Sequence, residues 1–414
     1  MNQDFKTAGT ARSDPLANTD LTDPAIVTDP YPTYRWLQDN APIAWNQQLN
    51  GWIVTRYKDV RQALQSPALS VEKLQPFVAH SSSEQRRDVE ILGEVLSDWM
   101  VFKDPPDHSK LRRALKDAFM PTEIKSLTPT VRATVDGLLE KLPVGQPCEV
   151  VSALAFPLPA MVIGDLFGLP LDEIDRLKAW SDPLGRFVLA ATDKSDLYPR
   201  AANAVREMKA RFHDLVADHR RAPRDNFTSR MIANAKDLTD DEIVHTLVLV
   251  LWAGHDTTTN LIATTLYHLC RNPDEFDRLR TNPDSIPAAV DELLRIDGPA
   301  HMLVRLAKAD LTIGDTAMRA GERLFLMMNT ANRDPAVFDA GDDLDLTRAE
   351  NRHLAFGRGV HMCLGAPLAR LEGEQVLHGL TERFRTIRFG DGEPVWRQNL
   401  IMRGPSKLTA IFET

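Results

Sequence analysis

The amino-acid sequence predicts a mainly α-helical protein with small β-sheets, and three features lead to this prediction. Long segments carry apolar residues at helical spacing, whereas the alternating patterns typical of strands are short. One apolar segment is long enough to cross a whole domain. Internal repeats, low-complexity tracts and a clear linker are all absent from the sequence, which favours one continuous body.

The longest predicted helix runs from about Asp240 to about Arg271. Thr239 and Glu242 have the spacing of a capping box, and Asn272-Pro273 provides the stop. At the usual rise per residue this helix is roughly 48 Å long, so it must cross the molecule.

Other elements follow from the same patterns. Asp104 and Pro105 have the residue types of an N-cap and a first helical residue. Further helices are predicted over 159–168, 201–219 and 364–384, and strands over 51–55, 311–313, 323–326 and 408–412.

The composition is that of a globular protein with a large core: 414 residues, 43% apolar and 26% charged. The net charge of −9 argues against nucleic-acid binding. Membrane association is not expected, because apolar runs fall far short of the roughly 20 residues that span a bilayer. We expect residues 1–24 to form a flexible arm and residues 25–414 to form a single domain. Three widely spaced cysteines do not make a disulfide framework, which favours a cytoplasmic location.

Cys363 lies in the segment 356–365, Phe-Gly-Arg-Gly-Val-His-Met-Cys-Leu-Gly. His361 is too close to Cys363 for the usual zinc spacing, and a structural zinc site needs four ligands, so a zinc-binding helical protein is disfavoured. A lone thiolate suits an iron that is already held by four macrocycle nitrogens, which is haem. Gly357 and Gly359 allow the loop to curl so that amide N–H groups point at the sulfur.

This segment resembles the cysteine loop of the cytochrome P450 superfamily, Phe-Gly-x-Gly-x-His-x-Cys-x-Gly, at every fixed position. The resemblance extends over roughly residues 30–414, and among members of the superfamily the chain resembles the soluble bacterial type. It implies the P450 fold, with haem b held between the long central helix and the helix that follows the cysteine loop. Cys363 is then the metal ligand, and Phe356 and Gly365 belong to the cofactor-binding set.

The centre of the long helix reads Ala-Gly-His-Asp-Thr-Thr over residues 253–258. A glycine within a helix costs about 1 kcal/mol, so Gly254 needs a reason. Close approach of a flat ligand is one reason, and a π-type widening at Thr257 is another. The segment is similar to the oxygen-activating segment of the family. The resemblance implies that Ala253 and Gly254 face the haem, that Thr257 hydrogen-bonds the dioxygen being activated, and that Asp256 helps to deliver protons.

Glu292 and Arg295 are three residues apart and can pair on one helix face. In the family this Glu-x-x-Arg pair is buried and structural. A third arginine normally joins it, and Arg333 and Arg348 are both candidates.

Four basic residues match the family positions that bind the haem propionates. His108 and Arg112 share a helix face. The resemblance adds Arg305 and His361. Haem carboxylates need such partners when they are buried.

The resemblance implies a monooxygenase that inserts one oxygen atom from O2 into a small lipophilic substrate by hydroxylation or epoxidation. Electrons are expected from a separate ferredoxin and its reductase, because the chain holds no flavin or iron–sulfur motif. A basic cluster is predicted to dock the ferredoxin: Lys110, Arg112, Arg113, Lys116, Arg358 and Arg370. A peroxide-dependent peroxygenase and a non-enzymatic haem sensor are the alternatives.

By family position, the substrate pocket is expected to include parts of 78–101 and 183–191. Trp252 is expected to limit the pocket volume, and His301 to add a polar anchor. The individual residues expected to line it are Leu249, Trp252, His301, Leu303, Ile401 and Met402. His245 and His268 are interpreted as ordinary helix residues.

Overall fold

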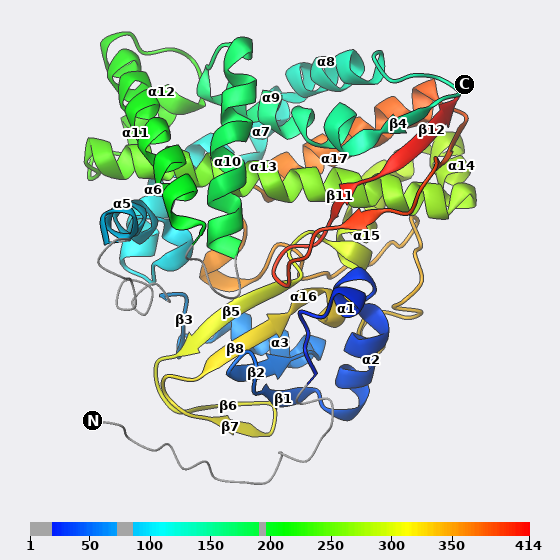
Figure 1. Cartoon of the computed structure of the whole chain (residues 1–414), viewed down its shortest axis with the longest axis horizontal. Coiled ribbons are helices and arrows are strands. Elements are labelled where there is room, and N and C mark those ends of the chain that lie inside the picture. Colours follow the sequence, from blue (N-terminus) through cyan, green and yellow to red (C-terminus); the bar gives the residue numbers. More distant parts are fainter. Residues whose placement is uncertain (1–18, 73–85, 190–195) are drawn as a thin grey trace.

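The computed structural model describes residues 19–72, 86–189 and 196–414. It consists of a large helical part and a smaller part built around a five-stranded sheet (Figure 1). Among the described residues, none of the helices has the length and apolar character needed to traverse a lipid bilayer.

The helical part is organised around α13, Asp240–Arg271, which crosses the whole of it (Figure 1). The predicted capping box is present, because the Thr239 hydroxyl accepts from Glu242 N and the Glu242 carboxylate accepts from Thr239 N. Most of α13 is buried, as expected for a helix with neighbours on most sides, but residues 252–254 and 256–257 at its centre are only partly buried. The other main helices of this part are α5 (Arg86–Ser97), α6 (Asp107–Lys116), α8 (Thr128–Leu139), α9 (Pro157–Phe167), α10 (Ile174–Leu189), α11 (Tyr198–Arg221), α12 (Phe227–Asn234), α14 (Pro273–Thr281), α15 (Ile286–Asp297) and α17 (Ala366–Arg383).

The sheet part contains the strand order β1-β2-β8-β5-β3. β2 runs parallel to β8, and β8 pairs antiparallel with β5, where Arg305 lies opposite Leu324. The strands of this part are β1 (Ile43–Asn46), β2 (Gly51–Val54), β3 (Leu69–Ser70), β5 (Met302–Ala307) and β8 (Arg323–Met327), with the hairpin β6 (Leu311–Ile313) and β7 (Thr316–Met318) beside them. Its helices are α1 (Pro24–Thr28), α2 (Tyr31–Asn40), α3 (Tyr57–Gln65) and α16 (Met328–Ala331).

Two small sheets complete the fold. β12 pairs with both β4 and β9, and β10 pairs with β11. The remaining elements are β4 (Pro147–Glu149), β9 (Thr386–Phe389), β10 (Val395–Trp396), β11 (Pro405–Lys407), β12 (Thr409–Glu413), α7 (Pro121–Ser126) and the short turns η1 (Met100–Phe102), η2 (Asp117–Phe119), η3 (Val151–Ala155), η4 (Leu171–Glu173), η5 (Pro283–Ser285) and η6 (Gly359–His361).

Two sequence-based boundaries need correction. Residues 19–24 of the expected flexible arm pack against the body: Leu21 is 1% exposed, and Asn46 donates to the Thr19 carbonyl. Residues 1–18 lie outside the described part. The helix expected at Asp104 begins instead at Asp107, because a residue that precedes a proline, as Pro105 does, is disfavoured in helical conformation.

Candidate functional site

The cysteine loop contains η6 and precedes α17, and it curls as predicted. The Cys363 N–H donates to the Phe356 carbonyl at 2.8 Å. Gly357 and Gly359 have φ angles of 69° and 75°, in the left-handed region that side chains disfavour. These two glycines therefore allow the chain to turn back under Cys363.

Amide groups of the following helix point at the Cys363 sulfur. The side chain is accessible to solvent, although protein surrounds it on most sides. This partial burial raises the pKa of the thiol, whereas N–H groups of Gly365 and Ala366 and the guanidinium of Arg112 lower it. Burial has the larger effect, so the pKa of the thiol stays above its usual value, and the donors offset part of the cost of forming the thiolate, which is the form that binds a metal.

Three separate elements bring four basic residues together near Cys363. α6 contributes His108 and Arg112, β5 contributes Arg305, and η6 contributes His361. The rings of His108 and His361 lie 4.2 Å apart between centroids. The structure thus assembles all four residues that the sequence predicted to bind propionates.

This basic cluster has too few anionic partners within the described chain. Arg305 is 8% exposed, and its guanidinium donates to the neighbouring Val304 carbonyl without forming an ion pair to any described carboxylate. Burial lowers the pKa of Arg305 to about 10. Burial, together with the charges of His108 and Arg305, lowers the pKa of His361 to about 4. The buried Nδ1 of His108 finds no hydrogen-bond partner among the described residues. Two haem carboxylates are the kind of partner that such buried cations require, so the residues present fit a haem.

Asp256 and Thr257 lie at the middle of α13. Asp256 packs against α10, where a Cβ added to Gly185 would be 2.6 Å from its Oδ2. His255 Nδ1 lies 3.5 Å from Asp256 Oδ1 and 3.3 Å from the Ser181 hydroxyl. The sequence did not single out His255 or Ser181, because the approach of α10 to α13 is a tertiary contact.

The predicted π-type widening at Thr257 is wrong. α13 is α-helical throughout, and the Thr257 hydroxyl donates to the Ala253 carbonyl at 2.7 Å, which leaves its lone pairs as acceptors. Gly254 has a packing reason of its own, because a Cβ there would approach Ile163 Cδ1 of α9 to 2.9 Å.

The Glu292–Arg295 pair is fully buried, as predicted. Arg295 donates to both oxygens of Glu292 at 2.7 Å, and each side chain is 0% exposed. Asn351 and the Asp345 N–H also donate to Glu292. The carboxylate therefore ties α15 to the segment that leads into the cysteine loop.

The structure identifies Arg348 as the third member of this network. Its Nε lies 3.1 Å from Glu292 Oε2. Arg333 instead donates twice to the Ile296 carbonyl and lies over the Tyr31 ring. In the acidic segment 339–345, the backbone carbonyls of Gly341 and Asp343 accept hydrogen bonds from Arg295.

Parts of the expected substrate pocket come together. Segment 300–303 meets 401–402 through the bridge between Ala300 and Met402 and the bond from His301 N to the Ile401 carbonyl. Leu249 is buried and Leu303 is half-buried. Trp252 stacks on Trp99 with centroids 5.0 Å apart. Residues 78–85 and 190–191 of the expected lining lie outside the described residues.

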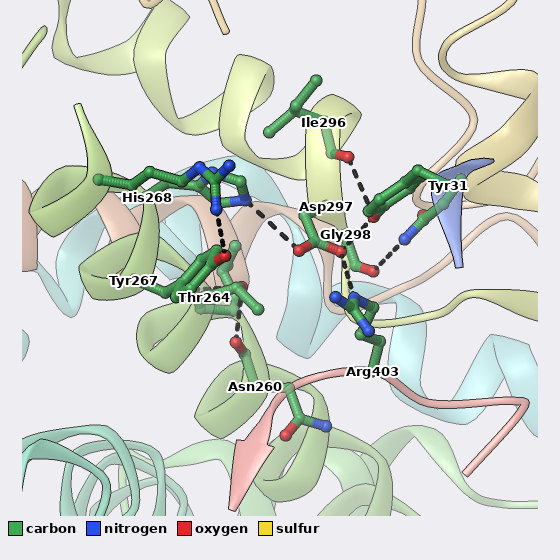
Figure 2. Close-up of polar contacts among 12 residues, drawn as sticks. Tyr31, Asn260, Thr264, Tyr267, His268, Ile296, Asp297, Gly298 and Arg403 are labelled. Atoms are coloured by element: carbon green, nitrogen blue, oxygen red, sulfur yellow. Dashed lines mark hydrogen bonds and ion pairs between the residues drawn. The ribbon is translucent and has the colours of Figure 1, made fainter. Parts of the chain in front are cut away.

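His301 does not serve as the expected pocket anchor. Its ring is buried beside Tyr31 and Tyr34, with Nε2 3.7 Å from Asp297 Oδ1. Figure 2 shows the centre of this network. The Asp297 carboxylate accepts hydrogen bonds from the Tyr31 hydroxyl and from Arg403 Nε, and His268 Nε2 lies 3.4 Å from Asp297 Oδ2. His268 is thus also part of a buried polar network, which helical spacing did not reveal.

Comparison with known proteins agrees with this geometry. The sequence model of the family "Cytochrome P450" matches residues 77–412. The biotin biosynthesis cytochrome P450 of Bacillus subtilis (strain 168) is 34% identical over 94% of this chain and 97% of its own length. The mycinamicin IV hydroxylase/epoxidase of Micromonospora griseorubida is 34% identical over 92% and 94%. The crystal structure of P450BioI in complex with hexadec-9Z-enoic acid ligated acyl carrier protein has a TM-score of 0.88 and 32% identity, and it covers 94% of this chain and 99% of that one.

The chain belongs to the cytochrome P450 family. It has the P450 fold and is a P450 monooxygenase, an oxidoreductase that uses haem and O2.

Proposed function

We propose that this P450 inserts one oxygen atom of O2 into a small lipophilic substrate, by hydroxylation or epoxidation, with electrons from a separate ferredoxin and its reductase. The second oxygen atom leaves as water after two electrons and two protons are supplied. The observation that carries the proposal is that one chain combines Cys363 with amide donors, a buried cationic cluster that needs carboxylates, and an acid–alcohol pair on α13.

Haem b fits the residues on both sides of this site. Cys363 would hold the iron through its sulfur, and His108, Arg112, Arg305 and His361 would pair with the propionates. Ala253, Phe356 and Gly365 would lie on the surfaces that face the macrocycle, whereas the side-chain position of Gly254 faces Ile163 of α9. A thiolate-ligated haem supplies the power to cleave the O–O bond.

Protons reach the site through Asp256 in this proposal. The carboxylate lies between α13 and α10, with the buried His255 beside it and the buried Ser181 hydroxyl beside His255. Because the Thr257 hydroxyl donates its proton to the Ala253 carbonyl, the Thr257 oxygen can accept a hydrogen bond from another donor. This pair favours O2 as the oxidant over peroxide.

The substrate class follows from the apolar lining. Leu249, Leu303 and Ile401 are aliphatic, and the stacked Trp99 and Trp252 add aromatic surface. We expect a small or flat lipophilic ligand to shift the haem from low to high spin. Trp252→Ala should alter that spectral response, and an unchanged response would remove Trp252 from the site.

A docking surface for an acidic ferredoxin surrounds the cysteine loop. Val360 and Met362 are exposed apolar residues of the loop, 57% and 43% accessible. Arg113 and Lys116 are exposed on the adjacent α6. Lys110 and Arg370 contribute less than expected, because Glu242 and Asp291 pair with them. An apolar centre with basic neighbours suits a transient, salt-sensitive complex.

Stopped-flow reduction by a ferredoxin tests this surface. Arg113→Glu should slow electron transfer at low salt, with the difference shrinking as ionic strength rises. Lys407→Glu, on exposed β11, is the matched control and should have no effect. Equal rates for Arg113→Glu and wild type at low salt would contradict the docking site.

The activity itself is tested with isotopic oxygen. Turnover with 18O2 and a reduced redox partner should give product that carries one labelled atom, and turnover with peroxide alone should be much slower. The carbon monoxide complex of the reduced protein should show the red-shifted band of sulfur ligation. A product without label, or a normal rate in Cys363→Ser, would refute the proposal.

A further inference from the structure

His245 has a buried imidazole ring, and one of its two nitrogens has no hydrogen-bond partner among the described residues. It lies on α13 and is 1% exposed. Its Nδ1 is 2.7 Å from Oδ2 of Asp98, the residue that follows α5. Its Nε2 is buried and has no hydrogen-bond partner among residues 19–72, 86–189 and 196–414. The bond to Asp98 fixes the proton on Nδ1, so the Nε2 lone pair points away from Asp98.

Two carboxylates lie near this lone pair. Glu94 lies in the last turn of α5, and its Oε1 is 3.9 Å from His245 Nε2. Asp241 precedes His245 by one turn of α13, so the two share a helix face. One donor atom from each of Glu94, Asp241 and His245 lies within 4.8 Å of the other two. His213 of α11 adds a second imidazole, with Nε2 3.0 Å from Asp241 Oδ1.

We propose that Glu94, Asp241 and His245 bind a divalent transition-metal ion of the Zn²⁺ class, with His213 or water as the fourth ligand. Imidazole nitrogen and carboxylate oxygen are ligands that Zn²⁺ takes in tetrahedral sites. Asp98 holds His245 as outer-shell carboxylates hold zinc-ligating histidines elsewhere. A cluster of exposed acids alone does not make a metal site, and the buried, aimed Nε2 of His245 distinguishes this one.

Lys209 competes with the metal for Glu94. Its ammonium lies 2.6 Å from Glu94 Oε1, and it must leave before that oxygen can coordinate an ion. The Glu94 side chain is 51% exposed and the Asp241 side chain is 59% exposed, so both can rotate toward His245 without disturbing the core. The structure therefore predicts that removing the Lys209 charge strengthens metal binding.

The proposed ion joins α5 to α13 beside the wall of the candidate substrate pocket. Trp99 follows Asp98 directly in the chain and stacks on Trp252, which is seven residues and two turns after His245 on α13. An ion at Glu94 and His245 restrains this part of α5 against α13. Metal binding itself is independent of the proposed oxygenation, so the two proposals can fail separately.

Zinc uptake by the haem-loaded protein tests the site. After dialysis against micromolar Zn²⁺, wild type should retain one zinc per chain by elemental analysis, with the dissociation constant from calorimetry. Glu94→Gln and Asp241→Asn should each weaken binding by about tenfold or more, since loss of an outer-shell partner alone costs that much. Lys209→Met should bind more tightly.

The control is Glu90→Gln, which neutralises an exposed carboxylate one turn earlier on α5 and should leave the affinity unchanged. Thermal unfolding provides a second readout, because zinc should raise the melting temperature of wild type but not of Asp241→Asn. Uptake below one equivalent by wild type overturns the proposal. An unchanged affinity in either Glu94→Gln or Asp241→Asn also overturns it.

Discussion

Replacing Arg348 by methionine removes one of the two guanidinium groups that hold the buried Glu292 carboxylate. The Arg348 side chain is 13% exposed and its Nε lies 3.1 Å from Glu292 Oε2. A hydrogen bond to a charged group contributes about 1.5–3 kcal/mol. With an unfolding entropy of about 2.1 cal/mol/K per residue, the 414 residues give about 0.9 kcal/mol/K, so the melting temperature should fall by about 2–3 °C.

Glu292→Gln should cost more than Arg348→Met. It leaves Arg295 and Arg348 buried without a counter-charge, a change of about 3–5 kcal/mol and therefore about 3–6 °C. The decisive quantity is the coupling between the two substitutions. Arg348→Met should be milder in the Glu292→Gln background by about 1–3 kcal/mol, because its partner charge is already gone.

A double-mutant cycle on the haem-loaded protein, followed by urea and thermal unfolding, measures this coupling. Arg333→Met supplies the matched cycle. Arg333 binds the Ile296 carbonyl rather than Glu292, so its coupling to Glu292→Gln should stay below about 0.5 kcal/mol. Additive effects for Arg348, or strong coupling for Arg333, would refute the reasoning.

Three other predictions use different measurements. Burial lowers the pKa of His301 to about 4. As the pH falls, His301 is therefore protonated in the unfolded chain before it is protonated in the folded protein. His301 thus supports full stability above about pH 6.5, and up to about 3 kcal/mol is lost as the pH falls toward 4. His301→Gln should flatten the pH dependence of the urea midpoint in that window, and an unchanged slope would contradict this. Gly185→Ala places a methyl group 2.6 Å from Asp256 Oδ2 and should lower the product formed per O2 consumed while raising peroxide release. Gly137→Ala, where an added methyl group meets no neighbour, should behave as wild type. Arg305→Leu removes a buried cation and should speed haem transfer to an acceptor globin roughly ten- to hundredfold, whereas unchanged transfer would exclude a propionate contact.

Local sequence signals located the elements and the central ligand well. The capping box at Thr239 and the stop at Asn272 determine both ends of α13, and both signals are local to the sequence. Gly357 and Gly359 predicted the turn of the cysteine loop, because positive φ angles are a property of single residues. The helix that begins at Asp107 starts two residues later than predicted, because two consecutive prolines override a good capping residue.

Long-range partners were beyond the reach of sequence spacing. Arg333 and Arg348 were equivalent candidates along the chain, and only the path of segment 339–351 placed one of them beside Glu292. His301 was expected in the substrate pocket, yet its ring turns toward the α1–α2 region. His245 was interpreted as an ordinary helix residue until α5 brought Asp98 and Glu94 against it.

The sequence by itself determined the helix-rich class, and it singled out the cysteine proposed to bind the metal and the residues proposed to hold its cofactor, since each depends on local geometry or on a contiguous pattern. The tertiary structure decided which charges meet and which remain without a partner. Those outcomes depend on how distant segments pack, and the energy of a buried charge is set by the atoms around it rather than by its neighbours in the chain.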